Sequence, residues 1–439
     1  MSVEQIASVE KLRARAFQGG GRNVWALGDQ VVISGSNFTT MVLCARGMTP
    51  AEFGAFSLVY SALLLVNTLQ SSLINQPHNV IGSTRRGIDY VRYTSATALA
   101  QLLVTGIAAG LATCVGVISL HAGWKMSPLL LALAPAVLAW QLQEFARRVM
   151  YTEGRFLAAF SNDLICYGGQ TVILIMLFRN DAISGPRALL AIAAASGIAA
   201  MVGAWRLRSS LAAKPDLRAL KENWHFGKWL AGADLLNWCS SIYMYQYVAA
   251  VVLGTAATGV LKAAQTVFGP ARVMAFFLAT VLPIRFARTF SEQGSDAMHR
   301  QMTRIYALLL PALVTYCALV AIGSGWILHV LYGAKYSGYA PVLSLYAVYS
   351  LFGYIEMGLT AAISARRKTR YIVAGYIYGG MISVSIGWLL IRWLGVNGAV
   401  VGMMLTTLLV SARLLTAYRH ELRQHREVLP EPINVEACT

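Results

Sequence analysis

The sequence predicts an all-α integral membrane protein with about twelve transmembrane helices, arranged as two pseudo-symmetric six-helix bundles around a central cavity. Its 439 residues are 57% hydrophobic and only 13% charged, whereas soluble proteins average about 25% charged residues. The mean hydropathy is +0.56. A helical span needs about 20 mostly apolar residues, so the apolar content suffices for twelve spans and leaves little for a soluble domain. Charge alternation between successive loops and a weak internal repeat support the same architecture.

Twelve apolar runs are the expected spans. They cover residues 24–45, 53–76, 93–120, 128–146, 157–178, 187–205, 226–253, 256–284, 305–331, 341–363, 371–391 and 397–418. With the N-terminus placed in the cytoplasm, twenty-eight of the 36 Lys and Arg residues fall in inner segments and six in outer ones. This bias follows the positive-inside rule. We therefore expect both termini to be cytoplasmic, and the net charge of +17 to reflect orientation in the membrane, with no nucleic-acid partner.

The same spans divide the chain into lobes. We expect a cytoplasmic N-terminal segment over 1–23, which can form an amphipathic helix on the inner surface. An N-lobe over 24–207, a basic cytoplasmic linker over 208–225, a C-lobe over 226–419 and a cytoplasmic tail over 420–439 follow.

An internal repeat relates the two lobes. A shift of 205 residues places Asp29 on Asp234, Ser36 on Ser241 and Gly54 on Gly259. Because each half has six spans, the halves run in the same direction through the membrane, as in other transporters with parallel repeats.

Two basic residues stand inside the eighth span, where each costs about 2.5–3.5 kcal/mol on the insertion scale. Lys262, Gln265 and Arg272 share one stripe of this helix, and Pro270 is expected to bend it. One interpretation is that Lys262 and Arg272 line a wet cavity. The other is that Lys262, near the outer end of the span, reaches the outer interface.

Other polar residues inside spans are further candidates. The substrate-binding candidates also include Asn67 and Gln70 in the second span and Asn237 and Tyr245 in the seventh. Such residues either line a cavity or join helices by hydrogen bonds.

Three acids are candidates for ion coupling: Asp234, Glu356 and Asp29. Asp234 and Glu356 either neutralise a cation of the eighth span or carry a proton or sodium ion. Asp29 either binds a coupling ion or complements the dipole of its helix. Glu144, three and four residues before Arg147 and Arg148, predicts an ion pair at the interface.

No catalytic residue, metal site or cofactor is expected. The six cysteines lack metal or redox spacing. The candidate energy sources are a proton gradient, a sodium gradient and the membrane potential.

The opening of the chain is similar to that of a known group of transporters. The segment "ALGDQVVISGSNFTTMVLCARGMTPAEFGAFSLVYS" (26–61) resembles the start of polysaccharide-type flippases of the multidrug/oligosaccharidyl-lipid/polysaccharide exporter superfamily. The matching parts are Gly28-Asp29-Gln30, "ARG" at 45–47 and "PAEFGAFSL" at 50–58, with "GRF" at 154–156.

The resemblance implies a flippase that moves a lipid-linked oligosaccharide from the inner to the outer leaflet of the bacterial inner membrane. The implied carrier is undecaprenyl pyrophosphate, the implied mechanism is alternating access, and Lys262 and Arg272 match the cationic cavity of such proteins. Other membrane proteins of polysaccharide assembly are candidate partners. Ser57 and Asn67 stand at the equivalent positions of the second span, so the candidate cations belong to one half.

Two alternatives remain. A cation-coupled multidrug exporter of the same superfamily would need an acidic pocket, whereas the deepest charges of the eighth span are basic. A membrane enzyme such as a glycan polymerase would need a catalytic His or acid, or a long external loop. All predicted outer loops are short, and none of the histidines falls at mid-membrane.

Overall fold

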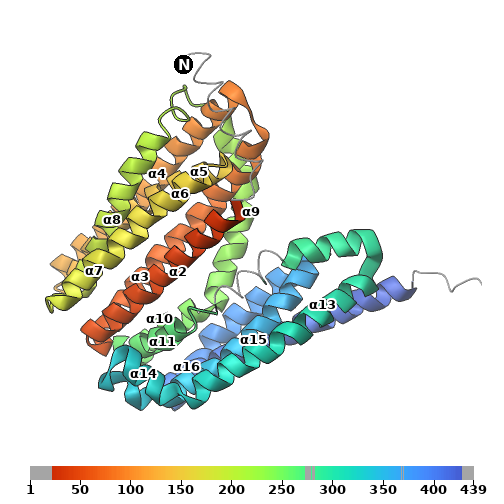
Figure 1. The fold of residues 1–439 in the computed structure, drawn as a ribbon. Coiled ribbons are helices and arrows are strands. Elements are labelled where there is room, and N and C mark those ends of the chain that lie inside the picture. The colour runs from red at the N-terminus through yellow and green to blue at the C-terminus, as the bar shows by residue number, and fades with distance from the viewer. Residues whose placement is uncertain (1–21, 272–277, 279–281, 367, 369, 428–439) are drawn as a thin grey trace, which may run out of the picture. The chain divides into compact units, whose positions relative to one another are not determined.

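The computed structural model describes residues 22–271, 278, 282–366, 368 and 370–427. Within this part of the chain the secondary structure is helical, without strands, which confirms the all-α class (Figure 1). The chain forms two compact units. Of the described residues, the first holds 22–238 with Gly254–Gly269 and Leu331–Gly333. The second holds the described residues within Cys239–Leu253, Pro270–Val330 and 334–427.

The first unit is built on a bundle whose helices run side by side (Figure 1). Its helices are α2 (Arg22–Gly47), α3 (Pro50–Gln70), α4 (Gly87–His121), α5 (Ser127–Thr152), α6 (Phe156–Asp163), α7 (Gly169–Arg179) and α8 (Gly185–Arg206). Helix α3 begins with Pro50 in its first turn, and the Thr49 hydroxyl accepts a hydrogen bond from the amide of Glu52. This is the N-cap arrangement that the sequence Thr-Pro-x-Glu favours.

Three short π-helical segments interrupt the bundle helices. They are η1 (Ser71–Asn75) and η2 (His78–Gly82) after α3, and η3 (Leu164–Gly168) between α6 and α7. Such segments widen the helix locally and occur often at functional sites. The one at Ser71–Asn75 directly follows Gln70, one of the predicted polar residues.

Two further helices complete the first unit: α9 (Arg218–Ser240), as far as Trp238, and α11 (Thr255–Val267). Helix α11 packs on α3 and α2. It ends at Val267, before the Gly269-Pro270 pair, so the expected bend at Pro270 is an end of the helix. The reason is that proline lacks the amide proton that would continue the helix.

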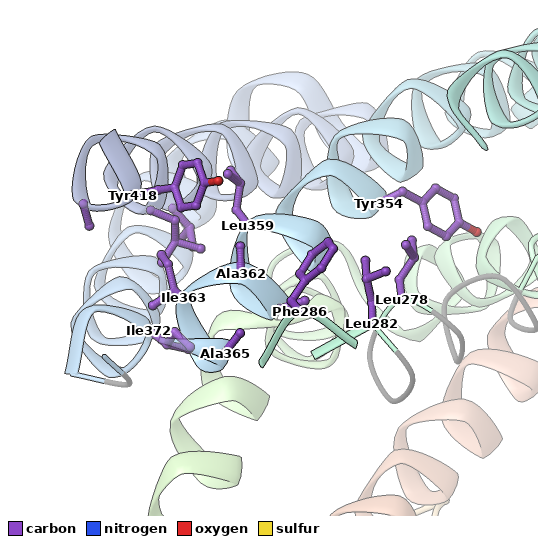
Figure 2. Close-up of a cluster of buried hydrophobic side chains, with 14 of the residues drawn as sticks. Leu278, Leu282, Phe286, Tyr354, Leu359, Ala362, Ile363, Ala365, Ile372 and Tyr418 are labelled. Carbon is purple, nitrogen blue, oxygen red and sulfur yellow. The ribbon is translucent and has the colours of Figure 1, made fainter. Parts of the chain in front are cut away.

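The second unit contains α10 (Ile242–Leu253), α13 (Leu282–Ile322), α15 (Ala340–Ala365) and α16 (Arg370–Glu427). It also contains most of α14 (Ser324–Tyr332) and the 3₁₀ turn η5 (Ala334–Tyr339). Figure 2 shows its buried core, where Phe286 and Leu282 of α13 lie with Leu359 and Ile363 of α15 and Tyr418 of α16. Burial of such side chains stabilises a membrane bundle mainly through close packing.

Helix α16 is two helices joined at Gly395. This residue has φ +61°, a left-handed conformation that glycine adopts without a steric cost. The chain folds back there so closely that a Cβ atom on Gly398 would lie 2.0 Å from the carbonyl oxygen of Leu390. The break separates the expected spans 371–391 and 397–418, as predicted.

The expected count of twelve spans is not confirmed by the described residues. By length and composition, eight helical stretches of the described residues are long and apolar enough to cross a membrane. One of them, Arg370–Leu422, contains two expected spans. The first, seventh and eighth expected spans correspond to α2, to α9 with α10, and to α11, which are outside those eight. The count of twelve therefore stays a prediction.

The seventh expected span is broken. Helix α9 ends at Ser240 and α10 begins at Ile242. At the break the Ser241 hydroxyl accepts a hydrogen bond from the amide of Tyr243, 3.3 Å away, a local bond that competes with the helix. Asn237 and Tyr245, both expected on the seventh span, therefore lie on separate helices, α9 and α10. The segment 1–23 lies, up to residue 21, outside the described residues, as does the tail from residue 428.

Candidate functional site

Helices α3 and α11 touch through their backbones. A Cβ atom on Gly54 would lie 1.7 Å from the carbonyl oxygen of Thr255, and one on Gly259 would lie 2.3 Å from that of Pro50. Small residues at such a crossing let membrane helices approach closely. The contact places α11, which carries Lys262 and Gln265, directly against α3, which carries Asn67 and Gln70.

Lys262 lies inside this helix pair, with 4% of the residue exposed. Its Nζ donates a hydrogen bond to Oε1 of Gln265 at 2.9 Å. The same Nζ lies 5.7 Å from the centre of the Tyr60 ring on α3, within the range of a cation–π interaction. An amide and an aromatic face therefore stabilise an ammonium group that would otherwise be costly to bury.

An aromatic stack continues from Tyr60 into the first unit. The Tyr60 ring lies 5.8 Å from that of Phe56 and 6.4 Å from that of Trp140 on α5, both stacked. The indole Nε1 of Trp140 donates a hydrogen bond to the hydroxyl of Tyr167 at 3.3 Å. The Tyr60 ring that contacts Lys262 is thus held in place by packed aromatic side chains.

Asn67 and Gln70 meet at one residue of α5, Gln141. The side-chain amide of Gln70 donates to the carbonyl oxygen of Gln141 at 3.0 Å, and that of Asn67 lies 3.5 Å from its Oε1. Gln101 of α4 donates to the same carbonyl oxygen at 3.2 Å. In the described part of the chain, Oε1 of Gln70, Oε1 of Gln101 and Nε2 of Gln141 are buried without a hydrogen-bond partner. This amide cluster therefore has unused donor and acceptor capacity.

Asp234 of α9 is bound to the π-helical segment η1. The Ser72 hydroxyl donates to Oδ2 of Asp234 at 2.5 Å. The two elements touch there, because a Cβ atom on Gly227 would lie 2.6 Å from the carbonyl oxygen of Ser72. Asn237 lies three residues after Asp234 on the same helix and is exposed. The π-helical turn is wider than an α-helical turn, and it places the Ser72 hydroxyl beside the carboxylate of Asp234.

Asp29 belongs to a buried ionic cluster that joins α2, α5 and α6. The guanidinium of Arg147 lies 3.6 Å from Oδ2 of Asp29, 3.1 Å from Oδ2 of Asp163 and 3.0 Å from Oε2 of Glu144. Tyr151 donates a further hydrogen bond to Asp29 at 2.5 Å. Asp29 therefore faces a fixed cation of the protein, and its candidacy for ion coupling stays a prediction.

Glu144 also pairs with Arg148, at 2.8 Å. The predicted pairs at three and four residues are thus present. Their burial shows that Arg147 serves the interior of the bundle, where one guanidinium balances acids from three helices.

Two candidates lie in the second unit. Tyr245 is fully buried, and its hydroxyl shares a hydrogen bond with that of Thr406 at 2.7 Å. A Cβ atom on Gly387 or Gly402 of α16 would lie 2.6 or 2.7 Å from its ring, so Tyr245 fills a space that two glycines leave. Glu356 of α15 is partly buried, and its carboxyl group interacts with the hydroxyl of Thr407.

The structure therefore groups the predicted residues in pairs. Lys262 joins Gln265, Asn67 and Gln70 meet at Gln141, and Asp234 joins Ser72. Arg272 lies outside the described residues. Sequence reasoning missed Gln101 and Gln141, although an amide in the middle of an apolar run is a signal that could have found them.

Comparison with protein families gives one match. Residues 43–341 match the family model described as "Polysaccharide biosynthesis protein". No curated protein sequence matched the chain.

Solved structures show the same fold. An inward-facing multidrug resistance MATE family transporter of the MOP superfamily aligns with a TM-score of 0.76 and 12% identity, over 91% of this chain and 96% of that one. The lipid II flippase MurJ, in an inward closed conformation, gives 0.68 and 10% over 91% and 87%. A MOP superfamily transporter from Pyrococcus furiosus, described by the reverse polarity of its binding pocket, gives 0.61 and 11% over 96% of each chain.

Proposed function

Because the chain belongs to the polysaccharide biosynthesis proteins of the multidrug/oligosaccharidyl-lipid/polysaccharide exporter superfamily, we propose that it is a flippase for a lipid-linked oligosaccharide. The substrate would be carried on undecaprenyl pyrophosphate and moved from the cytoplasmic to the outer leaflet of the bacterial inner membrane. The lipid II flippase among the structural neighbours moves a lipid-borne substrate by its printed name. In this proposal the chain is a multi-pass protein with both termini in the cytoplasm, and not an enzyme.

One observation carries the proposal beyond the family: the buried ammonium group of Lys262. A pyrophosphate linkage is anionic, and a hydrogen bond to a charged group contributes about 1.5–3 kcal/mol. Gln265 and the ring of Tyr60 hold the ammonium group in place before substrate arrives. Arg272 would add bidentate contacts to a second phosphate oxygen.

The amide cluster suits the saccharide part of such a substrate. Gln70, Gln101 and Gln141 each have one buried polar atom without a partner among the described residues. Amides donate and accept hydrogen bonds, as sugar hydroxyls do. The side-chain amides of Asn67, at the edge of the cluster, and of Asn237, on α9, would also donate and accept hydrogen bonds with sugar hydroxyls.

Transport by alternating access needs a source of free energy. An inside-negative potential assists the outward movement of an anion by about 2.3 kcal/mol per charge per 100 mV.

Asp234 and Glu356 are the better candidates for binding a coupling proton or sodium ion, because the ion pairs of the described residues include neither of them, whereas Asp29 faces Arg147. Membrane proteins of polysaccharide assembly are the expected partners.

The alternative of a multidrug exporter predicts an acidic site for organic cations. Lys262 favours an anion instead, and a drug-susceptibility panel on a deletion strain separates the two.

The decisive experiment replaces Lys262 in a strain that lacks the chromosomal gene. Lys262→Ala is expected to reduce export of the native glycan roughly ten- to hundredfold, which corresponds to the loss of about 1.5–3 kcal/mol of binding. Lys262→Arg keeps the charge and should retain part of the export. Lys125→Ala removes an exposed lysine between α4 and α5 and is the matched control. Normal export by Lys262→Ala at normal protein level would overturn the assignment.

A further inference from the structure

A groove runs along the first unit between α4, α5 and α8. Its volume is about 860 Å³, and among its eighteen lining residues Gln101 alone is polar. It extends along α8 from Leu190 to Leu207. At about 1.5 Å per residue this is roughly 25 Å, most of the hydrocarbon thickness of a bilayer.

Small side chains create the groove. Helices α5 and α8 pack so tightly that a Cβ atom on Gly203 would lie 2.7 Å from that of Ala146. On the side facing α4, Ala193, Gly197 and Ala204 line the groove and present too little volume to fill the space between the helices. Leu102, Leu138 and Met201 stand exposed along its edges. The result is a long apolar groove whose edges are exposed at the surface of the first unit.

One end of the groove is basic. The loop after α8 supplies Leu207 and Leu211 to its lining, and between and after them stand the exposed Arg208 and Lys214. The Arg208 guanidinium lies 4.8 Å from the ring of Trp205, itself exposed, an arrangement typical of the membrane interface. The same loop is fixed to α4, because the amide of Asp216 donates to the carbonyl oxygen of Arg92.

We propose that this groove binds one acyl chain of an anionic phospholipid, whose phosphate group lies at Arg208 and Lys214. Apolar burial along α8 gives the chain its site, and the two cations select the headgroup. Basic pockets at the end of transmembrane helices bind anionic lipids by the same combination. By the positive-inside rule this end is cytoplasmic, so the lipid would belong to the inner leaflet. The groove shares Gln101 with the amide cluster proposed for the saccharide, but Lys262 and its partners Gln265 and Tyr60 are not among its lining residues.

The test uses the full-length protein in nanodiscs containing phosphatidylglycerol and phosphatidylcholine in equal amounts, followed by native mass spectrometry. The wild-type protein should retain one phosphatidylglycerol with a preference of roughly thirtyfold, at about fivefold for each of two cations. Ala194→Phe fills the groove and should abolish retention of either lipid. Arg208→Glu with Lys214→Glu should keep a bound lipid but lose the preference.

Matched controls are Val172→Phe on the exposed face of α7 and Arg187→Glu at the opposite end of α8, both of which should behave as wild type. Equal retention by wild type and Ala194→Phe would overturn the site. Retention of both lipids alike by the wild type would overturn the headgroup assignment and indicate bulk lipid.

Discussion

Gly54 and Gly259 lie against one another at the crossing of α3 and α11, so closely that a Cβ atom on Gly54 would be 2.9 Å from the amide nitrogen of Gly259. The same two glycines are the ones that a shift of 205 residues superposes in the sequence. The two glycines that the sequence repeat pairs are therefore in contact in the first unit. The contact fixes the position of α11, and with it the position of Lys262.

Gly54→Ala should destabilise the protein. The added carbon would lie 1.7 Å from the carbonyl oxygen of Thr255, so α3 and α11 must separate, and overpacking of this kind costs about 1–3 kcal/mol. We expect a lower thermal-unfolding midpoint in detergent and reduced glycan export. Gly106→Ala in α4, where a Cβ atom meets nothing within 4 Å, is the control. Equal midpoints for the two variants would contradict the close approach.

Removal of Arg147 should be far more damaging than removal of Arg148. Arg147→Gln leaves Asp29 and Asp163 buried without their cation, a change that typically costs about 3–5 kcal/mol. Arg148 is partly exposed and pairs only with Glu144 among the described residues, so Arg148→Gln should cost less than about 1 kcal/mol. Thermal unfolding of the purified variants measures both.

A second variant isolates the cause. Arg147→Gln combined with Asp163→Asn removes one of the two buried charges that have lost their cation. The double variant should therefore be more stable than Arg147→Gln alone. If the double variant is as unstable as the sum of the single variants, the cluster does not act as an ionic unit.

The sequence predicted what depends on local pattern. The all-helical membrane class followed from hydropathy, the break between the last two spans followed from the apolar runs around Gly395, and Pro270 marked a disturbance in the eighth span. The pairs of Glu144 with Arg147 and Arg148 followed from helical spacing. Each of these needs only neighbouring residues to be specified.

Tertiary contacts were beyond such patterns. Tyr60 is far from Lys262 in sequence, and nothing local indicates that its ring lies over the ammonium group. The π turn that brings Ser72 to Asp234 has no composition signal. Arg147 looked interfacial because spacing cannot reveal that α2 and α6 bring Asp29 and Asp163 to it.

Tyr60→Leu should reduce glycan export, whereas Tyr60→Phe should retain most of it. The ring of Tyr60 faces Lys262 and stacks on Trp140, and phenylalanine preserves both interactions. A cation–π contact contributes about 0.5–2 kcal/mol, so Tyr60→Leu should lose roughly two- to thirtyfold of the activity. Export and protein level in the deletion strain are the measurements. Equal losses in both variants would indicate that the hydroxyl, and not the ring, is what matters.

The three acids should separate in a test of ion coupling. Asp234 and Glu356 interact with the hydroxyls of Ser72 and Thr407, and the ion pairs of the described residues include neither of them, whereas Asp29 already faces the guanidinium of Arg147. In proteoliposomes with an imposed proton or sodium gradient, Asp234→Asn or Glu356→Gln should abolish the dependence of transport on the gradient. Asp29→Asn should lower the unfolding midpoint and keep that dependence. Neutralising an acid affects coupling only where that acid exchanges its bound cation during transport. If Asp29→Asn folds and its transport no longer depends on the gradient, the coupling site lies in the ionic cluster instead.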